Sequence, residues 1–318
     1  MAKPRAGSVT EDWRNINKTW EEKLTHIYRC GYGTDITIKI CEDKNEKSFK
    51  AHRFVLSMSS EVFDTMLKAP VFRNPGDAIL MLVNVNAEAF AQFLEYVYCK
   101  KFQLSSTKNA IALHKIADKF NVLDLKLECA KYVDENLTVD NVMECCEYAD
   151  MYKLDDLKQR CNELIQNNTA SVLNENNMHT WKMEWIVLVL EQPKLSIKEP
   201  ELFRLIHKWV NTCSDNDCLK GKMYDCLVTK FCFLNFSGDE FVAGPVKSGM
   251  LTKNQSLAVL GHIVADENCH LDYPDNFNKT IRQYVEGGAE KTGSKMQTPK
   301  ISKESAVLSA RGSNTSKK

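Results

Sequence analysis

The apolar residues of this chain change their spacing near residue 100, and no other feature constrains the fold as strongly. Before that point Ile36, Ile38 and Ile40 alternate with polar residues, as in a half-buried strand, and 48–52 continues as a second strand. The apolar run 80–85 is typical of a buried strand, while 62–67 and 90–97 have helical spacing. Beyond residue 100 the spacing is helical, in segments of about 12–15 residues with short polar joints. This pattern predicts an α+β domain followed by an all-α helical domain.

The 318 residues suffice for two such domains and two short ends. We place the α+β domain at 20–136 and the helical domain at 137–275. We expect residues 1–19 to be flexible and residues 276–318 to form a disordered basic tail. After residue 286 this tail holds seven Lys or Arg residues, two Glu residues and no aromatic residue. Such a segment buries too little apolar surface to offset the entropy lost on ordering.

Charge and hydropathy exclude several classes of partner. Because 42 Lys and Arg residues balance 42 Asp and Glu residues, the chain lacks the basic field with which nucleic-acid-binding proteins hold phosphates. The longest purely apolar run, 185–190, is far shorter than the roughly 20 residues of a membrane helix. No apolar stretch follows the charged N-terminus, so we expect no signal peptide. The expectation is a soluble cytoplasmic protein, with the nucleus left open, that contacts neither nucleic acid nor membrane directly.

The twelve cysteines favour a reducing compartment over a disulfide framework. Several lie inside apolar periodic segments, where a free cysteine behaves as a small hydrophobic residue. One group of possible zinc ligands comprises Cys213, Cys218, Cys226 and Cys232, with His207 upstream. Only the first two cysteines come near the spacing of a zinc-binding pair, so the pattern favours free thiols.

Motifs for catalysis are also missing. The sequence contains no glycine-rich phosphate loop and no nucleophile elbow. Cys145 and Cys146 lie beside glutamates, whose charges raise the pKa of a thiol and oppose catalysis. His52 fits a buried histidine whose ring nitrogens are hydrogen-bonded. We therefore expect no catalytic residue, metal or cofactor, and an enzyme is the least favoured hypothesis.

Residues 49–57 read Phe-Lys-Ala-His-Arg-Phe-Val-Leu-Ser, and 60–63 read Ser-Glu-Val-Phe; together with Asp35 they resemble a BTB (POZ) domain. The segment 90–98 is similar to the next helix of that family, and 111–133 to its closing helical hairpin. Residues 196–210, which include Leu202-Phe203 and Trp209-Val210, resemble a BACK domain. The segment 241–252 is most similar to the BTB–BACK–PHR branch. Together these resemblances cover about residues 20–270, so we expect neither a PHR nor a kelch domain here.

The resemblance implies an adaptor protein. Members of this kind are substrate-recruiting subunits of cullin-3 RING E3 ubiquitin ligases, which act by dimerisation and proximity without a catalytic residue of their own. The alternative is a BTB scaffold or transcriptional regulator that does not act through a cullin. The implied partners are cullin-3, a second copy of the chain and a protein substrate that the sequence does not identify.

The expected dimer interface contains six residues. Trp20, Leu24, Ile27 and Tyr28 form an apolar stripe ahead of the first strand, and such a stripe outside the main domain suits a contact between identical copies. In the family this helix packs across the two-fold axis. The resemblance also implies that Asp35 and Arg53 form a charged pair near this interface.

The resemblance places the cullin contact on helix 60–67, the loop after it and the start of the closing hairpin. The candidate residues are Leu67, Val71, Phe72 and Phe120. In family members the loop carries an apolar residue two positions before a Glu, whereas 68–75 here contains no Glu. Phe120 could equally belong to the hydrophobic core.

Overall fold

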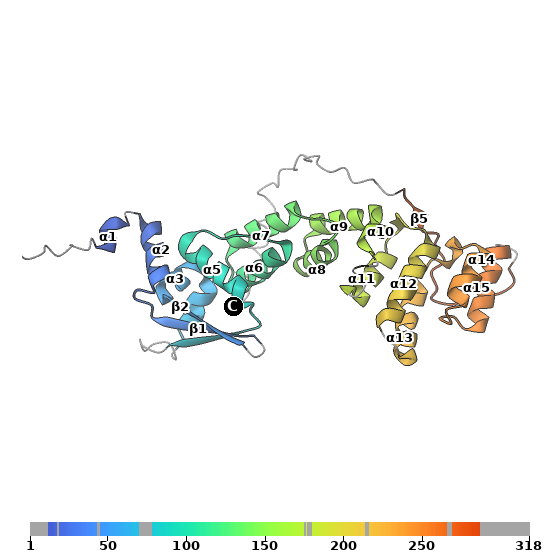
Figure 1. The fold of residues 1–318 in the computed structure, drawn as a ribbon, viewed down its shortest axis with the longest axis horizontal. Helices are drawn as coiled ribbons and strands as arrows, with labels where there is room; N and C mark the ends of the chain where they lie inside the picture. Colours follow the sequence, from blue (N-terminus) through green and yellow to red (C-terminus); the bar gives the residue numbers. More distant parts are fainter. Residues whose placement is uncertain are drawn as a thin grey trace, which may run out of the picture.

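The structure is a computed structural model that describes residues 12–17, 19–42, 45–69, 78–174, 176, 180–213, 216–265 and 269–286. Figure 1 shows an elongated molecule, with an α+β half at one end and a succession of helices leading to the other. The predicted order, α+β and then helical, is confirmed.

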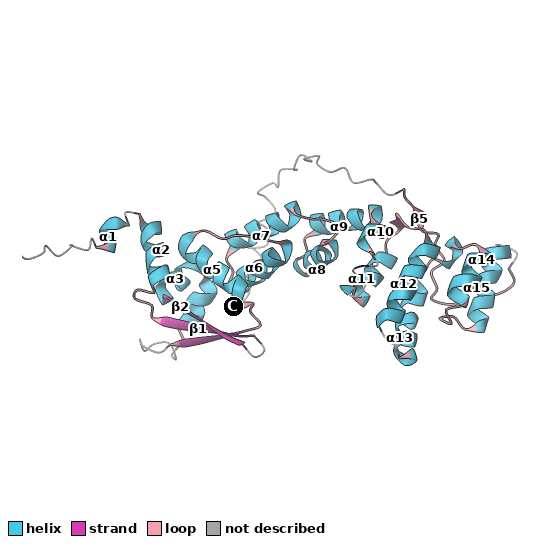
Figure 2. Ribbon diagram, viewed as in Figure 1, coloured by secondary structure: helices cyan, strands magenta, loops and turns pink. Residues whose placement is uncertain are grey.

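The α+β half is built around a three-stranded sheet of order β2-β1-β3. Strand β1 (Ile36–Glu42) pairs antiparallel with β2 (Asn45–Ala51) and parallel with β3 (Ile79–Val83). The alternating Ile36, Ile38 and Ile40 all point into the core, as their spacing predicts. Helices cover only one face of this sheet, which leaves the other face to solvent (Figure 2).

Seven further helices complete this half of the chain. They are α2 (Trp20–Cys30), α3 (Arg53–Ser59), α4 (Glu61–Leu67), α5 (Ala87–Cys99), α6 (Thr107–Lys119), α7 (Leu123–Glu135) and the single turn α1 (Trp13–Ile16). The apolar spacing did not predict helix α3, because this helix buries only Val55 and Leu56. Buried aromatic rings of α4 and α5 meet at the centre, with Phe63 and Phe93 6.2 Å apart between ring centroids.

The helical half extends from α8 to the last described residues. Its main helices are α8 (Val142–Tyr152), α9 (Asp155–Asn167), α11 (Met183–Leu190), α12 (Glu199–Cys213), α13 (Asp217–Leu227) and α15 (Lys253–Ala265). Shorter elements are α10 (Thr169–Val172), η3 (Val228–Lys230), η4 (Phe233–Asn235), α14 (Gly238–Phe241) and η5 (Val242–Val246). Strands β4 (Lys194–Leu195) and β5 (Gln283–Tyr284) form a small parallel pair. Each half has its own hydrophobic core, and Leu104 contacts both.

Both ends of the chain are more ordered than the sequence suggests. Trp13, in the segment expected to be flexible, stacks on His26 at 4.6 Å, so part of 1–19 is folded against α2. Residues 276–286, expected in the disordered tail, contain the buried Phe277 and Arg282 as well as β5. Both expectations were wrong for these residues. Trp13 contacts α2 and Arg282 contacts Glu199, and neither contact can be recognised from local sequence patterns. Residues 1–11 and 287–318 lie outside the described part.

Candidate interaction surfaces

Helix α2 carries the predicted dimer stripe and begins with a capping box. The Thr19 hydroxyl accepts from the Glu22 N–H at 3.1 Å, and the Glu22 carboxylate accepts from the Thr19 N–H at 2.9 Å. Leu24 and Tyr28 pack against the core of the chain itself, and Tyr28 stacks on Tyr98 at 4.7 Å.

The rest of the stripe stays accessible: Ile27 is half-buried and Trp20 is 80% exposed. The stripe therefore divides into two residues that anchor α2 and two that remain available for contact.

Helix α3 adds two exposed apolar residues that the sequence analysis did not select. Phe54 is 76% exposed and Met58 62% exposed, one helical turn apart. Helices α2 and α3 both pack against α5, and both lie at the same end of the molecule (Figure 1). Trp20 on α2 and Phe54 and Met58 on α3 are thus exposed apolar residues at this end of the molecule, and we call them the α2–α3 surface. Large exposed apolar residues are typical of a protein contact where they gather into a patch.

Asp35 and Arg53 meet, but not as the expected pair of charged side chains. The Asp35 carboxylate accepts from the backbone N–H of Arg53 at 2.8 Å, where it caps the first turn of α3. The Arg53 guanidinium instead donates to the Leu67 carbonyl at 3.2 Å. Both groups therefore hold α3 within one chain. Within one chain their side chains form no ion pair, and their place at the dimer interface stays a prediction.

Two of the four cullin candidates are core residues. Phe120 is 1% exposed and stacks on Phe63 at 4.1 Å, while Ser60 Oγ donates to the Phe120 carbonyl at 2.6 Å. Leu67 is 4% exposed in the same core. Their side chains cannot contact a partner on the folded surface, so both assignments were wrong. Val71 and Phe72 lie outside the described residues and stay predictions.

The accessible apolar surface near α4 lies instead on α7. Leu123 and Leu127 are exposed one turn apart, because α7 buries its Leu125, Cys129 and Val133 face. Leu123 and Leu127 have helical spacing themselves, so the spacing alone does not distinguish the exposed face of α7 from its buried face.

A hydrogen bond joins the turn between α6 and α7 to α4. Asn121, in the left-handed conformation at φ 51°, donates from Nδ2 to the Glu61 carboxylate at 2.6 Å. Asn tolerates this backbone conformation better than most residues. We call Leu123 and Leu127 the α7 leucine pair. Leu123 lies only two residues after Asn121, which contacts α4.

A groove of about 550 Å³ lies between the two halves, lined mainly by α6 and α8. Ile111, Ile116 and Met151 supply apolar lining, and Lys108 and Lys115 supply positive charge. The Tyr148 side chain also lines it; its hydroxyl is buried and has no partner among the described residues. A buried donor of this kind is costly unless a bound group satisfies it. The sequence analysis did not predict this groove, because its walls come from different domains.

His114 of α6 fixes the two halves against each other beside this groove. Its ring meets Tyr148 at 5.1 Å and Tyr152 at 4.4 Å, both edge to face. Burial lowers the pKa of His114 to about 4, and Lys126 acts in the same direction. The imidazole is therefore neutral at physiological pH.

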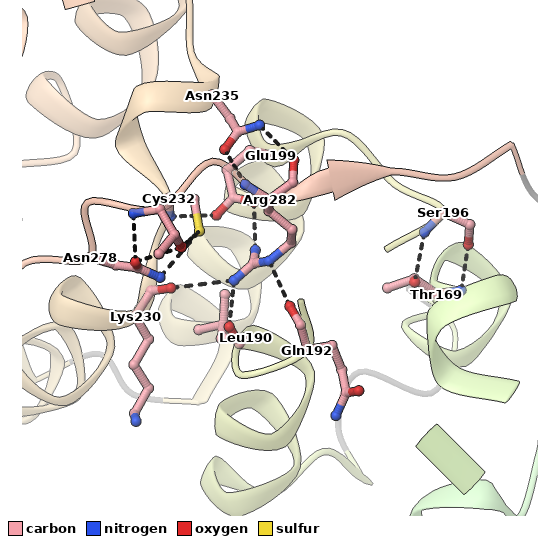
Figure 3. Close-up of polar contacts among 11 residues, drawn as sticks. Thr169, Leu190, Gln192, Ser196, Glu199, Lys230, Cys232, Asn235, Asn278 and Arg282 are labelled. Carbon is pink, nitrogen blue, oxygen red and sulfur yellow. Dashed lines mark hydrogen bonds and ion pairs between the residues drawn. The ribbon is translucent and has the colours of Figure 1, made fainter. Parts of the chain in front are cut away.

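The most buried ion pair among the described residues joins the segment that leads into β5 to the start of α12 (Figure 3). Arg282 Nη1 donates to the Glu199 carboxylate at 2.5 Å, and the two side chains are only 4% and 1% exposed. Arg282 Nε donates to the Gln192 carbonyl at 3.1 Å, and Nη2 to the carbonyls of Leu190 and Lys230. These carbonyls end α11 and η3, where a cation is favoured.

Glu199 also has a structural role. Its second oxygen accepts from the Cys232 N–H at 2.8 Å, and burial raises its pKa while Arg282 acts in the opposite direction. A cavity of about 370 Å³ adjoins this pair. The charged groups beside this cavity already hold the chain together, so the arrangement supports a structural latch. We call residues 278–286, which include Arg282, the C-terminal strap.

Other candidate reactive groups also have structural surroundings. Burial raises the pKa of Cys129 and of Cys145 to about 12, with a contribution from a neighbouring glutamate in each case. Cys146 shares a hydrogen bond with Cys161 that lowers its pKa, contrary to the expectation from the adjacent glutamates. The expected hydrogen bonding of His52 is confirmed: its ring nitrogens lie 2.8 Å from the Tyr98 hydroxyl and from the Tyr32 carbonyl.

The possible zinc ligands do not form a site. Cys232 is buried beside the strap, whereas Cys213, Cys218 and Cys226 are exposed. Across the described ranges, no three His, Cys, Asp or Glu side chains are placed to hold a metal ion. In the same ranges no helix is both long and apolar enough to cross a membrane.

Comparison with known proteins agrees with this division into halves. Residues 24–137 match the family model of the BTB/POZ domain, and residues 142–223 match that of the BACK domain, "BTB And C-terminal Kelch". Human BTB/POZ domain-containing protein 3 is 21% identical over 251 residues, which cover 77% of this chain and 48% of that protein. Kelch repeat and BTB domain-containing protein 8 of Xenopus tropicalis is 26% identical over 189 residues, 59% of this chain and 30% of that protein.

Among solved structures, the BTB domain of zebrafish PATZ1 is similar over 41% of this chain and 100% of its own, with 16% identity and a TM-score of 0.32. The chain spans about half the length, or less, of the two relatives named above. The two family models follow one another along the α+β half and the helical half. The resemblance seen in the sequence is therefore confirmed, and the chain belongs to the proteins that carry a BTB/POZ domain followed by a BACK domain.

Proposed function

We propose that the protein is a substrate-recruiting subunit of a cullin-3 RING E3 ubiquitin ligase, acting in the cytoplasm as a homodimer. The observation that carries this proposal is the BTB–BACK order together with separate apolar contact surfaces on the BTB half. No residue of the chain takes part in the chemistry. The adaptor raises the local concentration of a bound substrate near the ligase, and two copies raise it further.

The α2–α3 surface is the proposed dimer contact. Trp20 and Phe54 are large aromatic residues that gain most when a partner removes them from water. Replacing Phe54 and Met58 together by Asp should convert the dimer to a monomer in light scattering. The matched control is Leu219→Asp, which charges an exposed apolar residue of the BACK half. A dimer that survives the double substitution would exclude this surface.

The proposed cullin contact lies on α4 and the α7 leucine pair, with the α6–α8 groove as a second contact. The groove suits an extended segment whose apolar side chains meet Ile111 and Met151. The loop residues Val71 and Phe72 complete the proposed contact, as the family resemblance implies.

Calorimetric titration with the cullin-3 N-terminal domain tests this function directly. We expect the double variant Leu123→Asp, Leu127→Asp to bind weaker by about 2 kcal/mol, and Phe72→Ala to lose on the order of 2 kcal/mol, since buried apolar anchors dominate interfaces. Leu219→Asp should bind like the wild type. Absence of binding by the folded wild-type dimer would reject the ligase function in favour of a scaffold that does not use a cullin.

A further inference from the structure

The two edge strands of the BTB sheet are protected very differently. Strand β2 exposes Glu46, Lys47 and Lys50, charges of the kind that discourage pairing with another chain. Strand β3, at the other edge, reads Ile-Leu-Met-Leu-Val and contains no charge, proline or glycine. Its Ile79, Met81 and Val83 are 47%, 52% and 61% exposed. An uncharged apolar edge is a strand-pairing surface unless something covers it.

The backbone of β3 offers hydrogen-bonding groups on its outer side. Thr37 N–H donates to the Ala78 carbonyl, so the parallel ladder to β1 uses alternate residues, and the amides of Ile79 and Met81 point away from it. Within the described ranges, β3 pairs with no strand other than β1. Lys119 Nζ donates to the Val83 carbonyl at 3.0 Å, and this exposed lysine has to leave that carbonyl when a second strand pairs there.

We propose that β3 pairs antiparallel with β3 of a second copy, around a two-fold axis at Met81. This arrangement places Ile79 opposite Val83 of the other copy and Met81 opposite Met81, so that every pair is apolar. Charge does not oppose the contact, because the only lysine of β1 on the same face, Lys39, is paired with Glu46 at 2.7 Å. The β2 edge instead carries the charged residues Glu46, Lys47 and Lys50.

The small size of the contact determines how it would act. A five-residue strand is about 17 Å long, whereas stable interfaces bury about 1,200–2,000 Å² in total. The contact is therefore weak between single copies and becomes effective when each copy is already dimeric. Two different two-fold contacts on one chain, α2–α3 and β3, link dimers into larger assemblies.

Sedimentation velocity of the full chain across a wide concentration range tests this inference. We expect the wild type to grow in mass with concentration and Met81→Lys to associate on the order of tenfold more weakly, because two lysines would face each other across the axis. Ser48→Lys, which adds the same charge on the same face of β2, is the matched control and should behave like the wild type. Met81→Thr retains β propensity and serves if the lysine variant does not fold.

A wild-type mass that does not change with concentration would overturn the inference, as would equal behaviour of Met81→Lys and Ser48→Lys. The contact rests on the proposed α2–α3 dimer but not on cullin binding. Loss of cullin binding with retained growth in mass would reject only the adaptor, and the reverse result would reject only the β3 contact.

Discussion

The BTB half and the BACK half differ in how they treat charged residues. The described BTB half buries no Asp, Glu, Lys or Arg, and it exposes large apolar side chains on α2, α3, β3 and α7. The BACK half buries Glu199 and Arg282, which attach the C-terminal strap, and it also buries the hydrogen-bonded side chains of Gln166 and Gln192. The difference indicates that the BACK half uses a buried ion pair to hold its own chain, whereas the described BTB half is held together without one.

The largest expected effect is on the BACK half. Arg282→Met leaves the buried Glu199 without its cation and should lower the free energy of unfolding by about 3–5 kcal/mol. Urea denaturation measures this loss. The control is Arg160→Met, which breaks the exposed pair with Asp134 and should cost at most about 1 kcal/mol. Equal effects of the two variants would contradict the latch.

A large-to-small substitution in the BTB half tests the apolar packing of its core. Phe120→Ala removes a ring that stacks on Phe63 and should lower the free energy of unfolding by about 3 kcal/mol through the cavity it leaves. Leu123→Ala, three residues later but exposed, should change it by less than about 0.5 kcal/mol. If Phe120→Ala were neutral for stability, the core assignment would be wrong.

The junction between the halves should depend on pH. His114 has a pKa of about 4 in the folded chain and near 6.5 when unfolded, so the unfolded chain binds the proton first as pH falls. The stability due to neutral His114 is present above about pH 6.5 and lost as pH falls towards 4. Between pH 7 and 4.5 the wild type should lose about 2 kcal/mol more than His114→Phe, which has no titrating ring. Parallel curves for the two proteins would show that His114 is not buried neutral.

The smallest expected effect concerns the cap of α3. Asp35→Ala removes the acceptor of the Arg53 N–H and should lower the free energy of unfolding by about 1 kcal/mol. Asp35→Asn retains an acceptor and should restore most of that loss. If Asp35 acted instead as half of an ion pair between copies, both variants would weaken the dimer equally.

Much of the fold could be predicted because backbone geometry imposes local spacing. The alternation at Ile36, Ile38 and Ile40 predicted the central strand, and regular helical spacing predicted the long helices. The family motif at 49–63 correctly identified the domain. The candidate site was less predictable, because exposure depends on neighbours distant in sequence. Phe120 and Leu123 are both apolar residues at one helical joint, yet only Phe120 is buried.

The sequence by itself therefore determined the two-domain order, the strands and most helices, since these follow from side-chain periods that are local to each element. Only the tertiary structure decided which face of α7 is buried, and that Asp35 caps α3 from outside it. The structure also decided that Arg282 pairs with Glu199, 83 residues earlier. A buried charge is stable only where a partner, backbone carbonyls and low exposure coincide, and no local pattern encodes that coincidence.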